Sequence, residues 1–243
     1  MALTSPERFD AHGVFVAFEG GEGAGKSTQV QLLAAWLADS GYEVVATREP
    51  GATMAGERIR ALLLDPATEL TAAAEALLYA ADRAEHAARV VRPSLDRGAV
   101  VVSDRYIDSS VAYQGYGRGL DPTVVAQISR WATGELLPRL TVLLDLPVAV
   151  TRQRLLERGG TDRLESEADA FHERVRRGFR ALAAADAARY AVIDASGEVE
   201  QVAAQVRAAV EPLLPAVTST TGASNASGAS GASGAGRPAG MSR

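Results

Sequence analysis

VFVAFEGGEGAGKSTQ, residues 14–29, decides the fold. An apolar run ends in Glu19, and the segment from Gly20 to Ser27 then fits the pattern G-x-x-x-x-G-K-[ST]. The glycines let the backbone turn with its N–H groups pointing inward, a concavity that binds phosphate oxygens. An expected strand before the loop and an expected helix after it supply the context that this motif requires. The stretch therefore predicts a nucleoside triphosphate site.

Individual positions of this loop have expected roles. Lys26 can reach the β- and γ-phosphate oxygens, and the hydroxyl of Ser27 can ligate Mg²⁺. The helix that follows, predicted over residues 27–38, aims the positive end of its dipole at the phosphates. The residues that we expect to bind the triphosphate are Gly20, Gly21, Glu22, Gly23, Ala24, Gly25, Lys26, Ser27 and Thr28.

Composition narrows the class of protein. The 243 residues suit one α/β domain, and the net charge of −5 gives no general attraction to nucleic acid or to an anionic membrane. The absence of cysteine excludes disulfides, thiolate metal sites and cysteine nucleophiles. No apolar run approaches the roughly 20 residues of a membrane span, and the first dozen residues lack the regions of a signal peptide. We expect a soluble cytoplasmic protein with neither nucleic acid nor membrane as a partner.

Strands and helices alternate along the rest of the chain, which predicts a parallel sheet covered by helices on both faces. Strands are expected at 14–18, 43–47, 99–103, 140–146 and 190–193. Helices are expected at 27–38, 55–64, 71–91, 93–97, 121–131, 148–157, 166–188 and 198–214, with a glycine-containing loop at 114–119. We predict one domain over residues 13–215 with a lid at about 158–166, a flexible leader over 1–12, and a disordered tail rich in Gly, Ala and Ser over 216–243.

Charged residues follow several of the predicted strands. Arg48 comes after the second strand and Asp104-Arg105 after the third, at the edge where α/β sheets bind ligands. Two guanidinium groups converging there could hold a phosphate bidentately. Asp104 is a candidate to face Mg²⁺, and Asp145 is its rival. We favour Asp104 because no arginine follows Asp145.

Four motifs in register give a specific resemblance. Residues 18–27, Thr47 to Gly51, and Asp104 to Tyr106 resemble thymidylate kinase, as does Arg158-Gly159 with Asp162-Arg163. The resemblance covers roughly residues 14–210. It implies a five-stranded parallel sheet of the nucleoside monophosphate kinase type, Mg²⁺ as cofactor, a homodimer, and the reaction of ATP with dTMP to give ADP and dTDP. The glutamate in the phosphate loop resembles the bacterial type, in which the lid supplies a catalytic cation.

The resemblance also implies residue roles. Tyr79 would stack on thymine, Arg83 would donate to its O4 oxygen and so exclude dCMP, and Tyr113 would exclude a ribose 2′-hydroxyl. The full set expected at dTMP is Glu22, Arg48, Tyr79, Arg83, Arg105, Ser110, Tyr113 and Gln114. The expected catalytic set is Lys26, Asp104, Arg105, Arg158 and Arg163, with Ser27 and Asp104 at the metal.

Several alternatives stay open. Glu19 fits an anchor for the loop as well as it fits a substrate contact, and Arg152 and Arg154 fit a solvated face as well as a functional one. Trp36 and Trp131 are expected in a core or an interface, and the three histidines, at 12, 86 and 172, are expected at the surface. The rival functions are a kinase of the same fold with another acceptor, and a nucleotide-dependent switch. A switch has no need of a second anion site, so the arginines argue against it.

Overall fold

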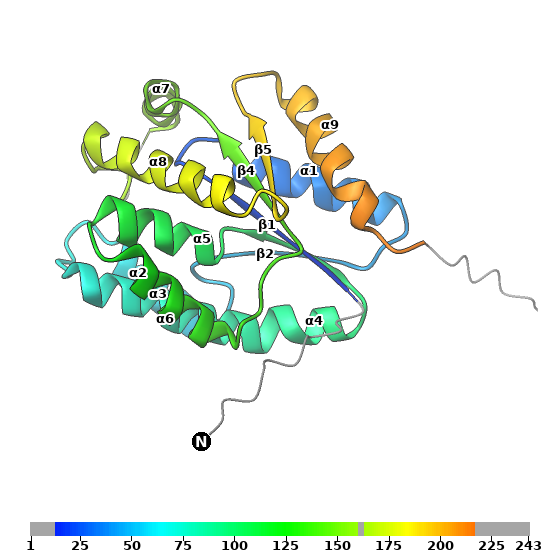
Figure 1. Ribbon diagram of the computed structural model, residues 1–243, viewed down its shortest axis with the longest axis horizontal. Helices are drawn as coiled ribbons and strands as arrows, with labels where there is room; N and C mark the ends of the chain where they lie inside the picture. The colour runs from blue at the N-terminus through cyan, green and yellow to red at the C-terminus, as the bar shows by residue number, and fades with distance from the viewer. Residues whose placement is uncertain (1–12, 160–162, 217–243) are drawn as a thin grey trace, which may run out of the picture.

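A central sheet of five parallel strands forms the core of the computed structural model, which describes residues 13–159 and 163–216 (Figure 1). The strand order is β2-β3-β1-β4-β5, which confirms the expected sheet. The bounds are β1 Val14–Gly20, β2 Val44–Arg48, β3 Val100–Asp104, β4 Leu140–Asp145 and β5 Tyr190–Asp194. The predicted leader, most of the predicted tail and residues 160–162 lie outside the described part of the chain.

Helices cover both faces of the sheet. Their bounds are α1 Lys26–Asp39, α2 Met54–Leu64, α3 Ala72–His86, α4 Arg92–Asp96, α5 Ile107–Ser110, α6 Pro122–Thr133, α7 Val148–Arg158, α8 Asp169–Ala185 and α9 Val199–Val210. Two π-helical segments, η1 Ala87–Val91 and η2 Val111–Gly117, and a 3₁₀ turn, η3 Glu211–Leu213, complete the set. Figure 1 shows α1 and α9 side by side on one side of the sheet and α2, α3 and α6 on the other.

The central strand β1 explains why this arrangement is stable. All of its residues are buried, because alternate side chains enter the cores on the two faces of the sheet. Val16 and Phe18 pack with α1 and α9, whereas Phe15 and Ala17 pack with the layer that contains α4 and η2. A third cluster joins β4 to α8, α3 and η2. Burial on both faces produces the unbroken apolar runs seen in the sequence.

The site lies where the strand order changes direction. β1 pairs with β3 on one side and with β4 on the other, and their carboxyl ends share one edge of the sheet. Phe18 is in register with Asp104, and Arg48 of β2 is also in register with Asp104. This register brings the phosphate loop, the end of β2 and the end of β3 together, at the crevice where open α/β sheets bind ligands.

The expectation of a loop at 114–119 is wrong over most of its length, because α5 and η2 are helical as far as Gly117. The glycines there serve close packing. A Cβ atom at Gly117 would lie 2.7 Å from Cε2 of Phe171 on α8, and one at Gly178 on α8 would lie 2.8 Å from the ring of Tyr116. Glycine at these positions lets η2 and α8 approach each other.

Two other expectations need correction. The helix expected at 71–91 ends its α-helical part at His86 and continues as η1, ahead of Pro93, whose ring and missing N–H disturb regular α-helical bonding. His86 is fully buried instead of lying at the surface. For Trp131 the sequence left a core or an interface open, and its 82% exposure excludes the core and leaves the interface.

Candidate active site

The phosphate loop starts at the last residue of β1. Gly20, Gly23 and Gly25 have positive φ values of 138°, 71° and 89°, and a Cβ atom on Gly20 would lie 2.4 Å from the carbonyl oxygen of Leu144. Glycine is therefore required at the point where the loop leaves the sheet. The Nζ atom of Lys26 donates to the carbonyl oxygens of Gly20 and Gly21, at 3.2 and 2.8 Å. The backbone of the phosphate loop therefore holds the Lys26 ammonium group in place.

Ser27 and Asp104 bring oxygen atoms together beside this loop. The Ser27 hydroxyl donates to Oδ2 of Asp104 at 2.6 Å. The rival carboxylate, Asp145, is instead held by Arg176 through two hydrogen bonds of 2.7 and 3.0 Å. In the described residues no group of three or more histidine, cysteine or acidic side chains could hold a metal ion. A hydroxyl and a single carboxylate suit Mg²⁺, which keeps several water ligands and binds substrate phosphates.

A cavity of about 510 Å³, the phosphate-loop cavity, opens in front of these residues. Lys26, Arg48 and Arg105 all line it, so the phosphate loop and the strand-end arginines share one space. Its lining is Glu22, Gly23, Gly25, Lys26, Ser27, Thr28, Arg48, Glu49, Arg60, Asp104, Arg105, Arg154, Leu155 and Glu165.

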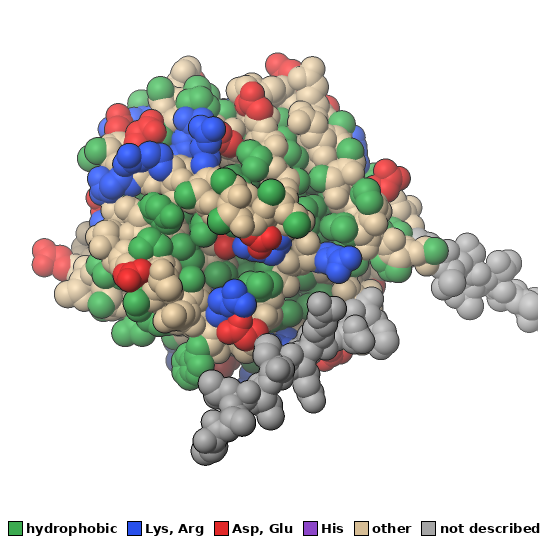
Figure 2. All heavy atoms as spheres, viewed as in Figure 1, with side chains coloured by type: hydrophobic (Ala, Val, Ile, Leu, Met, Phe, Trp, Pro, Cys, Tyr) green, Lys and Arg blue, Asp and Glu red, His purple; other side chains and the backbone are tan. Residues whose placement is uncertain are grey.

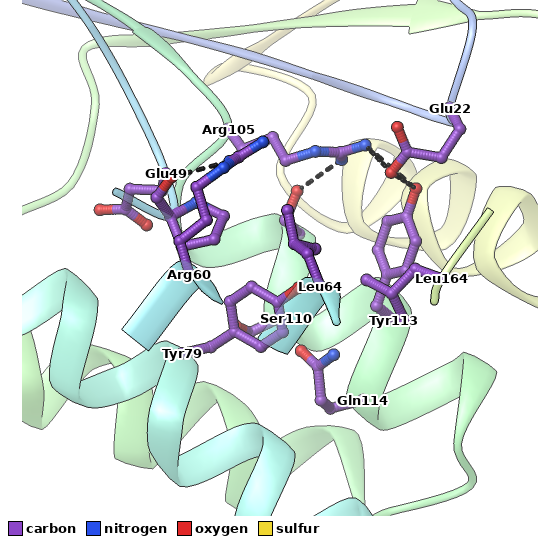
Figure 3. Close-up of a pocket in the computed structure, with 12 residues that line it drawn as sticks. Glu22, Glu49, Arg60, Leu64, Tyr79, Arg105, Ser110, Tyr113, Gln114 and Leu164 are labelled. Atoms are coloured by element: carbon purple, nitrogen blue, oxygen red, sulfur yellow. Dashed lines mark hydrogen bonds and ion pairs between the residues drawn. The ribbon is translucent and has the colours of Figure 1, made fainter. Parts of the chain in front are cut away.

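A narrower cavity of about 80 Å³, the tyrosine cavity, adjoins the first (Figure 3). The predicted residues Tyr79, Ser110, Tyr113 and Gln114 line it together with Glu22 and Arg105. The remaining lining residues are Glu49, Pro50, Arg60, Leu64, Ser109 and Leu164. Both cavities share Glu22, Glu49, Arg60 and Arg105. Figure 3 shows the Arg105 guanidinium between Glu49 and Glu22, above Ser110 and Tyr113.

Arg105 is held firmly at the junction of the two cavities. Its backbone has a φ of 72°, in the left-handed region that few non-glycine residues adopt. Its Nη2 atom bonds to Oε1 of Glu22 at 2.5 Å and to the hydroxyl of Tyr113 at 3.2 Å, and its Nη1 atom bonds to Ser109 and Gly20. A guanidinium group oriented in this way is ready to bind an anion.

Glu22 is ionised at neutral pH. Burial alone would raise its pKa, but the Arg105 and Lys26 charges hold the pKa of Glu22 at about 2. The Tyr113 hydroxyl also donates to Oε1 of Glu22, at 3.1 Å. The Glu22 carboxylate, which belongs to the phosphate loop, is therefore the ion-pair partner of Arg105.

Glu19 is an anchor of the loop that follows β3. It is fully buried, and it accepts hydrogen bonds from the backbone N–H groups of Tyr106 and Ser109 and from the Ser109 hydroxyl, at 2.9, 3.0 and 2.5 Å. Glu19 lines neither cavity. Burial, with Asp108 nearby, raises the pKa of Glu19 to about 7. Of the two alternatives left open by the sequence, the structure supports anchoring.

Two further cations line the phosphate-loop cavity. Arg48 is exposed at the end of β2 and has no ion-pair partner among the described residues. Arg60 of α2 lines both cavities and donates to the carbonyl oxygen of Pro50 at 2.9 Å. Sequence reasoning missed Arg60, since its helix was interpreted only by its apolar face. Its position on the first helix after the Arg48–Gly51 motif was the available signal.

Arg83 lies behind the wall of the tyrosine cavity rather than in it. Its side chain is 1% exposed, and Nε bonds to Glu49 at 2.7 Å. The other guanidinium nitrogens donate to Ser129, to the Tyr106 carbonyl and to the Ser110 hydroxyl. The expected direct donation to thymine is therefore not the arrangement seen here, because a buried cation takes the partners that the core offers. Arg83 reaches the cavity through Ser110.

The lid arginines differ in position. The Arg163 guanidinium bonds to the carbonyl oxygen of Leu63 and pairs with Glu75 at 2.6 Å, and it lines neither cavity. This places it away from the phosphate loop, contrary to the expected catalytic position. The side chain of Arg158 lies outside the described part of the chain. Arg154 lines the phosphate-loop cavity and contacts the carbonyl oxygens of Gly23 and Ala195.

A phosphate loop and a second, arginine-lined cavity meet at the switch point of a parallel sheet. This combination is the architecture of a nucleoside monophosphate kinase, in which two phosphorylated substrates face each other. No described helix is long and apolar enough to cross a membrane.

The comparisons with known proteins identify the family. The thymidylate kinase family matches residues 18–206. The chain is 54% identical over 208 residues to the thymidylate kinase of Clavibacter michiganensis subsp. michiganensis, covering 85% of this chain and 99% of that protein. It is 53% identical over 203 residues to that of Gloeobacter violaceus, covering 83% of this chain and 96% of that protein. The crystal structure of thymidylate kinase from Ehrlichia chaffeensis has a TM-score of 0.67 at 33% identity, covering 82% of this chain and 98% of that chain.

The chain belongs to the thymidylate kinase family, as the resemblance indicated. It is an ATP-dependent nucleoside monophosphate kinase, a phosphotransferase.

Proposed function

We propose that this protein transfers the γ-phosphoryl group of ATP to the phosphate of dTMP, giving ADP and dTDP. The observation that carries the proposal is that Lys26, Arg48 and Arg105 line one cavity. Phosphoryl transfer depends chiefly on positioning the two substrates and neutralising their charge. Two anions held face to face, one by the phosphate loop and one by guanidinium groups, meet that requirement.

The donor side uses the phosphate loop and the start of α1. On binding ATP, Lys26 exchanges the carbonyl oxygens of Gly20 and Gly21 for phosphate oxygens. The backbone N–H groups of Gly20–Thr28 and the positive end of α1 neutralise the triphosphate. Burial and the Arg105 charge lower the pKa of Lys26, and bound phosphate would oppose that shift.

Mg²⁺ fits the oxygen pair of Ser27 and Asp104, which we assign as its protein ligands, directly or through water. The bound ion would neutralise charge on the β- and γ-phosphates. The Ser27 hydroxyl and the Asp104 carboxylate, already 2.6 Å apart, orient each other for this role.

The acceptor side combines charge at one end with a pocket for the base at the other. Arg48 and Arg105 hold the dTMP phosphate, with Arg60 as a third cation. Tyr79 stacks on thymine, and Ser110 and Gln114 contact the base and sugar. Tyr113, which bonds to Glu22, excludes a ribose 2′-hydroxyl by its bulk. The phosphate oxygen of dTMP attacks the γ-phosphorus directly, so no side-chain nucleophile is needed.

The assignment of a catalytic cation in the lid is based on the sequence. Arg158 at the RG position is our candidate, acting on charge that develops between donor and acceptor. Arg163, which is engaged by Glu75, would have to leave that ion pair to serve in the same way.

A homodimer in the cytoplasm is also part of the proposal. Trp131 and Val124, exposed by 82% and 48%, are seven positions apart on α6 and so share one helix face. Leu77 of α3, the helix packed beside α6, is 57% exposed. An apolar surface of this kind suits contact with a second copy. A chain without cysteine suits a reducing compartment.

An acceptor panel tests the function. ADP release is followed by a coupled assay with dTMP, dUMP, dCMP and AMP, and we expect dTMP to react fastest. Arg48→Gln and Arg105→Gln should each lower kcat/KM for dTMP by about 100-fold or more, with ATP affinity little changed. Arg177→Gln is the matched control, because Arg177 is exposed on α8. Figure 2 shows basic side chains gathered over α7 and α8, and all of those on these two helices are arginines.

Equal rates with dTMP and AMP would contradict dTMP as the acceptor. Thermal melting with dTMP alone separates the kinase from a nucleotide-dependent switch. A kinase with a built acceptor site melts at a higher temperature when dTMP is present, whereas a switch shows no shift.

A further inference from the structure

Glu75 is a buried carboxylate that the proposed mechanism does not use. It lies in the first turn of α3, and its side chain is 1% exposed. Its Oε1 atom accepts from Nε2 of Gln114 at 2.9 Å and from Nε of Arg118 at 3.2 Å. Its Oε2 atom accepts from Arg118 at 3.2 Å and pairs with Arg163 at 2.6 Å. One carboxylate therefore connects three side chains from different parts of the chain.

The surroundings keep Glu75 ionised. Burial would raise its pKa, but hydrogen bonds from Arg118, Gln114 and Arg163 hold the pKa of Glu75 below its usual range. Its place at the start of α3 adds the favourable field of the helix dipole. An ionised carboxylate has no proton to donate and can only accept hydrogen bonds.

Because Glu75 can only accept hydrogen bonds, it determines the orientation of the side-chain amide of Gln114. The side of the amide that faces Glu75 must be the NH₂ group, since a carbonyl oxygen there would meet another acceptor. The carbonyl oxygen of Gln114 must then lie on the other side. Figure 3 shows it facing Ser110 and Tyr79, and Gln114, Ser110 and Tyr79 all line the tyrosine cavity. The wall of the cavity thus presents an acceptor whose orientation is set from behind.

We propose that Glu75 is a positioning residue for base specificity: it holds Gln114 so that a hydrogen-bond acceptor faces the base, and thereby selects a pyrimidine that carries N3–H. Thymine has a hydrogen on N3, whereas N3 of cytosine is an acceptor. A buried acceptor that meets another acceptor loses its hydrogen bond and keeps its desolvation cost. This inference rests on the proposed function, and it gives Glu75 and Gln114 the discrimination against dCMP that the sequence assigned to Arg83.

Glu75 also supports a second wall of the same cavity. Arg163 forms an ion pair with Glu75 and donates to the carbonyl oxygen of Leu63, and the next residue, Leu164, lines the tyrosine cavity. Leu164 is buried with Leu63, Tyr79 and Tyr113. The charge of Glu75 therefore holds the polar contact and the apolar wall of one pocket together.

Glu75→Gln tests the proposal with little change of shape. The new carboxamide keeps its oxygen at the Oε2 position, toward Arg163 and Nη2 of Arg118, and places its NH₂ group at the Oε1 position, facing Gln114 and Nε of Arg118. Gln114 must then rotate and present its own NH₂ group to the cavity. We expect the ratio of kcat/KM for dTMP to that for dCMP to fall about tenfold or more, chiefly through KM for dTMP. Glu167→Gln is the matched control, because Glu167 pairs with Arg118 and has no bond to Gln114, and its ratio should stay at the wild-type value.

A double-mutant cycle with Gln114→Leu shows whether Glu75 acts through the amide. In the Gln114→Leu background, Glu75→Gln should leave the dTMP-to-dCMP ratio unchanged. If Glu75→Gln does not fold, Glu75→Asp carries the same test, because it keeps the charge and withdraws the acceptor from Gln114. A folded Glu75 variant with the wild-type ratio overturns the proposal, as does an equal effect in both backgrounds. A wild-type protein inactive on dTMP overturns the proposed function itself, and the inference with it.

Discussion

At the scale of single residues, three of the predicted arginines are paired with carboxylates before substrate arrives. Glu22 forms an ion pair with Arg105, Glu49 with Arg83, and Glu75 with Arg163. Arg48 is the exception among the predicted arginines that the structure describes, since it is exposed and has no ion-pair partner within residues 13–159 and 163–216. An arginine paired in advance is held in one orientation, which reduces the entropy lost when an anion binds.

The two lid arginines should have separable effects. We expect Arg158→Ala to lower kcat about tenfold or more with little change in KM for ATP, because it removes a cation that acts on the transition state. We expect Arg163→Ala mainly to raise KM for dTMP, because it releases Leu164 from the cavity wall. Steady-state kinetics of both variants measure the difference. A larger loss of kcat in Arg163→Ala than in Arg158→Ala would contradict this assignment.

Glu19 should make stability depend on pH. Its pKa is about 7 in the folded protein and about 4.5 when unfolded, so between these values the folded state binds the extra proton. The free energy of unfolding therefore falls as pH rises from about 4.5 to 7 and levels off above 7. In the Glu19→Gln variant no group titrates at this position, so the free energy of unfolding does not fall with pH in this way. Thermal melts at pH 5, 6 and 7.5 measure the effect. We expect the Tm of the variant, relative to that of the wild type, to increase as pH rises.

Asp82 contributes to the same range, since burial and the charge of Glu49 raise its pKa to about 6. Its effect is common to both proteins and cancels in the comparison. A difference in Tm between wild type and Glu19→Gln that stays constant from pH 5 to 7.5 would show that Glu19 does not titrate there.

At the scale of elements, the ends of strands and the approach of helices place the side chains. The register of β1, β2 and β3 brings Arg48, Asp104 and the phosphate loop to one edge. On the helical side, η2 carries Tyr113 and Gln114 and packs closely on α8 through glycines. The tyrosine cavity therefore depends on how near α8 can come to η2.

Gly178→Ala tests this close approach. Helix propensity alone would favour alanine by about 1 kcal/mol. The added Cβ atom would lie 2.8 Å from the ring of Tyr116, so we expect a net loss of about 1–3 kcal/mol in the free energy of unfolding. Chemical denaturation measures it, with Ala181→Ser on the exposed side of α8 as control. Unchanged stability in Gly178→Ala would mean that the two segments separate at no cost.

At the scale of the whole molecule, the helices α3 and α6 expose apolar side chains that line neither cavity. The described chain buries its cores on both faces of the sheet, yet leaves Trp131 largely exposed. A large aromatic ring exposed together with Val124 and Leu77 is typical of a surface that contacts another protein. We propose that a second copy of the chain covers it.

Trp131→Glu should therefore shift the protein from dimer to monomer. Sedimentation velocity at micromolar concentration measures the change, because a charge in an apolar interface must lose its hydration without gaining a partner. Leu156→Glu is the control, since Leu156 is also an exposed apolar residue, at 74%, but lies on α7. A wild-type protein that sediments as a monomer would contradict the homodimer.

The sequence by itself determined the parallel sheet, the phosphate loop and the strand-end arginines, because each is encoded by residues close together in the chain. Apolar runs specify buried strands, and the spacing of Gly20, Gly25, Lys26 and Ser27 specifies the loop. The structure confirmed the sheet and brought most of the predicted site residues to two adjoining cavities.

Only the tertiary structure decided the partners of the buried charges. Glu75 meets Gln114 and Arg163 across separations of 39 and 88 positions, and Arg83 meets Glu49 across 34. A local pattern carries no information about such pairings, since they depend on which helices pack together. For the same reason no local pattern indicated that Arg83 and Arg163 would turn away from the cavities. A buried charge binds wherever folding supplies an opposite one, because burial without a partner costs more than any local preference can offset.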